Sequence, residues 1–239
     1  NAQFYEINDI RYPSRDILKR YHLLFYFKTK TKNHDKFSEV LLKFKNHNNV
    51  AIEWWAEYFW IAFNNLFNKY KPDDLRSSLP KNGFTYLIRP LSSAECEEDG
   101  YFEDSYHSLG LLGKSIQTKS HYDYKSKKIK FLEGFFVKYK RTKNMSSCRG
   151  IDERKKELAK GGMRIDSRYL PNLEDLKEKG LKPLFIIIDD VFTTGSTTNM
   201  MAELIQKSCP SKIIILTLER TLESTKSNIN RNYKIAGYK

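Results

Sequence analysis

The chain has 239 residues, a length that favours one α/β domain or two small ones. Its 42 basic and 29 acidic residues give a formal net charge of +13, which favours an anionic partner such as a phosphate ester, a nucleotide or a nucleic acid. With 40% hydrophobic residues, the composition excludes a disordered, solvated chain.

The cysteines and the apolar runs indicate the cellular location of the protein. Cys96, Cys148 and Cys209 lack the close spacing that a zinc knuckle or a disulfide framework requires. No stretch approaches the roughly 20 consecutive apolar residues of a membrane helix, and no secretory signal is evident. We therefore expect a cytoplasmic protein without a membrane partner.

Two helices are predicted between residues 35 and 70, with a break near residues 46–49, because apolar side chains recur there at intervals of three and four. The second helix carries aromatic residues around more than one face, so it is either buried between layers or supplies a homodimer surface. We expect residues 1–83 to form a helical region that packs on a main domain of residues 84–239, in one compact unit. The aromatic residues of the second helix are Trp54, Trp55, Tyr58, Phe59, Trp60 and Phe63.

The middle of the chain alternates in charge. A predicted strand over residues 84–91 precedes an acidic block at 95–104, and a helix is predicted over 105–117. Residues 114–143 carry ten basic side chains against two acidic ones, around a predicted strand at 129–139. This basic run is either a solvated face or an electrostatic funnel for polyphosphate or nucleic acid.

Two short helices are predicted ahead of the strongest motif. The first is a charged helix within residues 144–162, which has glycines at both ends. The second is capped by Asn172 and closed by Gly180.

The strongest signal begins at residue 184. An apolar run of strand length, LFIII, leads to Asp189 and Asp190, then to the turn TTGST and a helix that ends near Lys207. Acids at the carboxyl end of such a strand lie where open α/β sheets bind ligands. Glycine lets a phosphate approach the backbone, and the helix start supplies unpaired amides and a positive dipole end.

The same turn disfavours ATP hydrolysis, because it lacks the lysine of a nucleoside-triphosphate loop. Two carboxylates beside a phosphate cradle repel the phosphate itself. They are therefore expected to face ribose hydroxyls and a cation-bridged pyrophosphate.

The residues IIIDDVFTTGSTTNM closely resemble the signature of type I phosphoribosyltransferases, which bind 5-phosphoribosyl-1-pyrophosphate (PRPP). Three further stretches resemble the competence-associated (ComF) group of that family, and the resemblance spans roughly residues 37–222. These stretches are LLKFKNHNNVAIEWWAEYF, KRTKNMSSCRGIDERKKEL and IIILTLERTL.

The resemblance implies a mainly parallel central sheet flanked by helices, with a flexible hood at about residues 141–163. It implies that Asp189 and Asp190 are catalytic and hold the 2′ and 3′ hydroxyls, and that Mg²⁺ is held mainly by PRPP. The residues implied to bind the 5′-phosphate are Thr193, Thr194, Gly195, Ser196 and Thr197; those of the pyrophosphate loop are Arg89, Leu91, Ser92 and Ser93; those of the hood are Arg141 and Arg149.

The sequence departs from the family in three ways. The four-cysteine zinc module that usually begins ComF-group proteins is missing, and the acidic block follows Ser93 where relatives often have a basic stretch. At Thr193, where 6-oxopurine transferases have an aspartate base, this chain has only a hydroxyl, which disfavours purine salvage.

The five histidines lie apart in the sequence and have no metal-binding spacing.

Three functions are compatible with these patterns. The favoured one is a PRPP-dependent transferase that acts on an unknown base or nucleotide-like acceptor. The second is a catalytically weak module that binds PRPP or a nucleotide, in DNA uptake or phage defence. The third is a basic nucleic-acid-binding protein, for which the net charge is the main support.

Overall fold

A six-stranded sheet forms the centre of the computed structural model, which describes residues 2–7, 14–26, 36–66, 85–99, 107–122, 129–143, 147–148 and 151–221. In spatial order the strands are β1 (Tyr5–Glu6), β2 (Lys19–Tyr26), β8 (Lys212–Thr221), β7 (Leu184–Phe192), β3 (Thr85–Ile88) and β4 (Ile129–Phe131). The last five of these strands run parallel to one another, and β1 pairs antiparallel with β2 at one edge.

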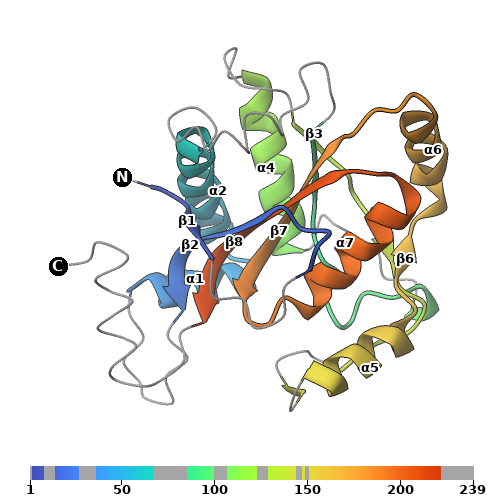
Figure 1. Ribbon diagram of the computed structural model, residues 1–239. Helices are drawn as coiled ribbons and strands as arrows, with labels where there is room; N and C mark the ends of the chain where they lie inside the picture. Colours follow the sequence, from blue (N-terminus) through green and yellow to red (C-terminus); the bar gives the residue numbers. More distant parts are fainter. Residues whose placement is uncertain are drawn as a thin grey trace.

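Helices cover both faces of this sheet (Figure 1). Side chains of α1 (Lys36–Lys45), α2 (Asn49–Asn64) and α4 (Ser108–Tyr122) pack on one face, and those of α6 (Leu170–Glu178) and α7 (Ser196–Ser208) pack on the other. The chain therefore has an α/β fold with a mostly parallel sheet between helical layers.

Strand β7 shows why its sequence is apolar without interruption. Leu184, Ile186 and Ile188 lie in the core beneath α1, α2 and α4, whereas Phe185 and Ile187 lie in the core beneath α6 and α7. All five side chains are fully buried. A parallel strand between two helical layers buries both of its faces, so apolar residues replace the usual alternation.

A smaller unit lies beside the sheet. Strands β5 (Phe136–Val137) and β6 (Arg164–Ile165) pair antiparallel, and α5 (Ile151–Gly161) lies between them in the chain. Helix α5 contacts α7. Two short 3-10 helices, at Glu97–Asp99 and Ser167–Tyr169, complete the described elements.

Several predicted elements are confirmed. Helices α1 and α2 are separated by residues 46–48, and α7 ends at Ser208, close to the predicted end. The aromatic side chains of α2 are mostly core: Trp55 and Phe59 are fully buried, whereas Trp54 keeps 37% of its surface exposed and stacks on Tyr58. The homodimer surface stays a prediction.

Other predictions are wrong in detail. Residues 129–139 form two short strands in different sheets, because a turn with Gly134 at φ +61° redirects the chain. Asn172 lies inside α6 and does not cap it, since the helix starts at Leu170 with a proline in its first turn. The acids lie within β7, which continues to Phe192, and do not follow it.

Strands β1 and β2 were not predicted, and they belong to the region predicted to be helical. Strand β2 pairs with β8 along its length. Arg20 and His22 are buried in it, at 4% and 2% exposure, and the Arg20 guanidinium donates to Asn199 Oδ1 at 3.0 Å. Buried polar residues removed the apolar pattern by which a central strand is recognised.

Within the described ranges, no helix is both long enough and apolar enough to span a membrane.

Candidate functional site

The candidate site lies where the chain leaves the sheet in two directions. From β3 the chain passes through α4 to β4 on one side, and from β7 it passes through α7 to β8 on the other. Strands β3 and β7 are neighbours, and the helices that follow them, α4 and α7, cover opposite faces of the sheet. The carboxyl ends of the two strands therefore flank a topological switch point. Open α/β sheets bind ligands in the crevice at such a point.

The turn after β7 depends on a glycine. Gly195 has φ +73° and caps the amino end of α7, while the Thr198 hydroxyl donates to its carbonyl at 3.0 Å. A Cβ atom at this position would lie 3.0 Å from the Phe192 ring. The turn therefore places bare backbone at the switch point, together with the first amides of α7, which have no partner within the helix.

Hydroxyl groups line this turn, and an arginine from α5 reaches them. The Oγ1 atom of Thr194 lies 2.9 Å from Ser196 Oγ. The Arg154 Nη1 atom donates to Thr194 Oγ1 at 2.8 Å and to Thr193 Oγ1 at 3.2 Å. A guanidinium, several hydroxyls and a positive helix end thus converge on one spot, which suits an anion.

Arg154 lies in the predicted hood but was not among its predicted site residues. A signal was available in the sequence, because Arg154 and Leu158 are one helical turn apart and share a face. Leu158 is buried at 6% exposure, so this face points into the protein. Of the two predicted hood residues, Arg141 is exposed and Arg149 lies outside the described residues.

The two acids of β7 point to opposite faces of the sheet. Asp190 shares its face with Ile188, on the α1 side, and Lys45 at the end of α1 places its Nζ atom 2.9 Å from Asp190 Oδ2. The Asp190 amide donates to Asp189 Oδ1 at 2.8 Å. Burial, together with the neighbouring Asp190 charge, raises the pKa of Asp189 well above its ordinary value.

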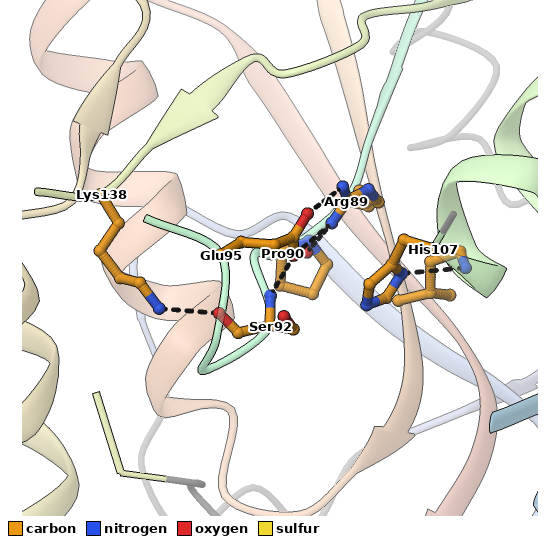
Figure 2. Close-up of polar contacts among 7 residues, drawn as sticks. Arg89, Pro90, Ser92, Glu95, His107 and Lys138 are labelled. Carbon is orange, nitrogen blue, oxygen red and sulfur yellow. Dashed lines mark hydrogen bonds and ion pairs between the residues drawn. The ribbon is translucent and has the colours of Figure 1, made fainter. Parts of the chain in front are cut away.

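The loop after β3 holds the predicted pyrophosphate-loop residues, and Figure 2 shows its contacts. Arg89, 6% exposed, donates through Nη1 to Glu95 Oε2 at 3.0 Å and through Nη2 to Oε1 at 2.5 Å. The Ser92 amide donates to the same carboxylate at 2.5 Å. Although burial acts to raise it, bonding to Arg89 holds the pKa of Glu95 below its ordinary value.

A buried lysine ties this loop to the hood. The Lys138 Nζ atom donates to the carbonyls of Ser92 and Ser93 at 2.7 and 3.1 Å, and also to Thr142 Oγ1 at 3.3 Å. Burial lowers the pKa of Lys138. Leu91, Ser92 and Ser93 are half-buried. The predicted loop residues therefore lie at the end of the strand next to β7, but Arg89 faces a carboxylate of its own loop.

Two histidines that are remote in the sequence lie together near the acids. The rings of His47 and His107 have their centroids 6.3 Å apart, and His47, in the turn between α1 and α2, has φ 59°. Burial, aided by the charge of Arg89, lowers the pKa of His107 to about 4, against the charges of Glu95 and Asp190. His107 is therefore neutral, and its Nδ1 atom accepts a bond from the Leu109 amide at 3.2 Å.

Among the described residues, no group of three or more histidine, cysteine, aspartate or glutamate side chains could hold a metal ion.

No protein-family model matches this chain, and no curated protein matches it. Its function is therefore inferred from the geometry of the site.

Proposed function

We propose that this protein is a PRPP-dependent phosphoribosyltransferase, in which an unknown base or nucleotide-like acceptor displaces pyrophosphate from C1 of the ribose. One observation carries the proposal: the half-buried acid pair and the hydroxyl-lined turn follow one another at a topological switch point. A sugar phosphate presents the complementary groups, with ring hydroxyls that donate to carboxylates and a phosphate that accepts from amides, hydroxyls and a guanidinium.

The turn from Thr193 to Thr197 would hold the 5′-phosphate. Gly195 leaves room for close approach, and the start of α7 adds the favourable end of the helix dipole. With the phosphate at this turn, the ribose ring would lie near Asp190, which comes three residues before Thr193 in the chain. The two parts of the ligand thus match two adjacent parts of the site.

Asp190 would act on the ring. It would accept hydrogen bonds from the ring hydroxyls and stabilise the positive charge that develops on the ring as pyrophosphate leaves. Asp189, on the other face of the strand, accepts a bond from the Asp190 amide and would help to position this residue. Holding acceptor and ribose in line supplies much of the remaining rate enhancement. Mg²⁺ fits this site as an ion carried mainly by the oxygens of PRPP, because Asp190 already has the Lys45 ammonium beside it.

The fold supports the same proposal. The mostly parallel sheet with helices on both faces is compatible with the fold that the resemblance to type I phosphoribosyltransferases implies, and α5 belongs to the residues predicted to form the hood. We assign the hood to residues 141–163. The acceptor is left open, because no base-recognition motif is present in the sequence.

A second function is favoured by the contacts of Arg89. If the guanidinium and the Ser92 amide stay bonded to Glu95, the groups that would meet pyrophosphate are occupied. The protein would then bind PRPP or a nucleotide with little turnover.

The test combines binding and turnover. The protein is incubated with Mg²⁺ and PRPP labelled in its β-phosphate, with and without a panel of bases, nucleotides and nucleic acids, and pyrophosphate release is followed. Release that depends on one acceptor supports the transferase. Binding of PRPP by calorimetry without release under any condition supports the binding module. Failure to bind PRPP and ribose 5-phosphate, with nucleic-acid binding that weakens steeply with salt, contradicts both.

A further inference from the structure

We propose that Arg154 of α5 is the residue by which this site selects ribosyl compounds that carry a 5′-phosphate over those that do not. The inference rests on the proposed function and extends it, because it assigns specificity for the 5′-phosphate to the hood. The substrate class it defines is the 5-phosphoribosyl compounds, to the exclusion of free ribose and nucleosides.

The fold holds α5 firmly enough to place this side chain. At the end of the helix, the Gly161 carbonyl accepts bonds from the Tyr139 and Lys140 amides at 2.9 and 3.2 Å. A Cβ atom on Gly161 would lie 2.7 Å from Thr142 Cγ2, so helix and hood segment are in close contact. Leu158 is buried on the same face as Arg154. The guanidinium is therefore directed at the turn by contacts at the end of the helix and by packing of the face that carries Arg154.

The charge balance around Arg154 points to an anion. Its two bonds go to neutral hydroxyls, and among the described residues no carboxylate lies within ion-pairing distance of it. Its Nε atom is buried and has no hydrogen-bond partner there. The guanidinium also stands beside the positive end of α7, which is unfavourable for a cation without a counter-charge. Arg89, by contrast, is fully paired with Glu95.

A phosphate monoester supplies what this cluster lacks. It brings negative charge and several acceptor oxygens, which the planar fork of a guanidinium binds through two parallel bonds. When the phosphate binds, Arg154 exchanges its bonds to Thr193 and Thr194 for bonds to phosphate oxygens, and the hydroxyls turn to donate as well. A nucleoside without the phosphate leaves Arg154 with only its neutral partners, so it gains nothing from this residue.

Arg154→Gln tests the assignment, because glutamine keeps a hydrogen-bond donor and removes the charge. The matched control is Lys155→Gln, the same charge change on an exposed residue of the same helix. Calorimetry with ribose 5-phosphate and with ribose measures the affinity for the sugar with and without its phosphate. We expect Arg154→Gln to weaken ribose 5-phosphate binding about ten- to hundredfold, the size of a lost charge-assisted hydrogen bond, and to leave ribose binding unchanged.

Lys155→Gln should change ribose 5-phosphate binding by less than about twofold. Equal losses in both variants would mean general attraction by the basic hood, and would overturn the inference. So would an Arg154→Gln variant that binds like the wild type while the wild type binds PRPP, a result that leaves the proposed function standing. A wild type that binds neither PRPP nor ribose 5-phosphate refutes both.

A second substitution of Arg154 tests whether the effect of Arg154→Gln is purely structural. Arg154→Lys keeps the charge without the fork, so it should recover part of the lost affinity for ribose 5-phosphate. Urea unfolding should give the three variants and the wild type similar midpoints. Loss of affinity in Arg154→Lys equal to that in Arg154→Gln, with lowered midpoints in both, would assign Arg154 to folding and overturn the inference.

Discussion

The loops that follow β3 and β7 leave the same edge of the sheet from neighbouring strands, and an arginine and backbone amides lie at each loop. After β3, the arginine and the Ser92 amide are bonded to Glu95, a carboxylate of the same loop. After β7, the arginine comes from a distant helix and meets only hydroxyls. The first loop therefore holds its own anion, and the second presents an incomplete site.

This difference predicts that the loop after β3 contributes mainly to stability and the turn after β7 mainly to ligand binding. A buried ion pair that also bonds a backbone amide fixes the conformation of its loop, because removal of either partner leaves a buried charge uncompensated. A cation that has only neutral partners gains most from an external anion. Under the proposed function, the turn after β7 would therefore dominate ligand affinity, and the loop after β3 would limit what can bind at C1.

The largest effect is expected at the acid pair. Asp190→Asn removes the charge that the proposed mechanism uses to stabilise the ring as it becomes positive, so turnover should fall about a hundredfold or more. Pyrophosphate release from PRPP measures it. Asp175→Asn, which alters an exposed ion pair on α6, should leave turnover unchanged. Full activity in Asp190→Asn would contradict the assigned role of the acid.

The loop after β3 should respond to Glu95→Gln in two ways. The free energy of unfolding should fall by about 3 kcal/mol, because Arg89 loses its buried counter-charge. Affinity for magnesium pyrophosphate should rise, because Arg89 and the Ser92 amide are released to an external anion. Urea unfolding and calorimetry measure the two effects.

Glu97→Gln is the control for this loop, since it alters an exposed pair with Arg164 and should cost less than about 1 kcal/mol. If Glu95→Gln destabilises the protein but leaves pyrophosphate affinity unchanged, the pair is structural and the comparison between the two loops fails at that point.

The free energy of unfolding should depend on pH through His107, which lies near charged residues of both loops. Its folded-state pKa of about 4 lies below that of an unfolded histidine, about 6.5. Between these values the unfolded chain binds more protons, so stability falls as the pH falls through this window. The contribution of His107 should amount to about 2–3 kcal/mol between pH 7 and pH 4.

Comparison with His107→Asn isolates this contribution from those of the nearby acids. Asparagine is a good amino-terminal cap, so it can still accept from the Leu109 amide without titrating. Unfolding of the variant should depend less steeply on pH over this range. Parallel pH curves for the variant and the wild type would show that the histidine is not protonated differently in the two states.

The smallest effect is expected at the turn glycine. Gly195→Ala should cost about 1–2 kcal/mol of stability, from its left-handed backbone and from contact with Phe192. Gly180→Ala separates the two causes, since φ is +64° there and no atom lies within 4 Å of the added Cβ. Thermal unfolding should show a larger loss for Gly195→Ala, and equal losses would mean that Phe192 yields to the methyl group.

The strand, turn and helix of the candidate site could be predicted from one continuous segment of the sequence. The apolar run from Leu184 to Ile188, the two acids, the glycine and the helix after it are all encoded within about 25 consecutive residues. Burial on both faces forces an apolar run, and a left-handed turn forces a glycine, so such features are visible without the rest of the fold.

The tertiary structure alone decided which side chains meet at this segment. Lys45 reaches Asp190 and Arg154 reaches Thr194 from helices far away in the chain, and β2 joins β8 across nearly the whole length of the described residues. Even Arg89, predicted to face pyrophosphate, turns to Glu95 only six residues further on. Local patterns report the conformation and burial of a segment, whereas the partner of a charged side chain depends on how separate elements pack.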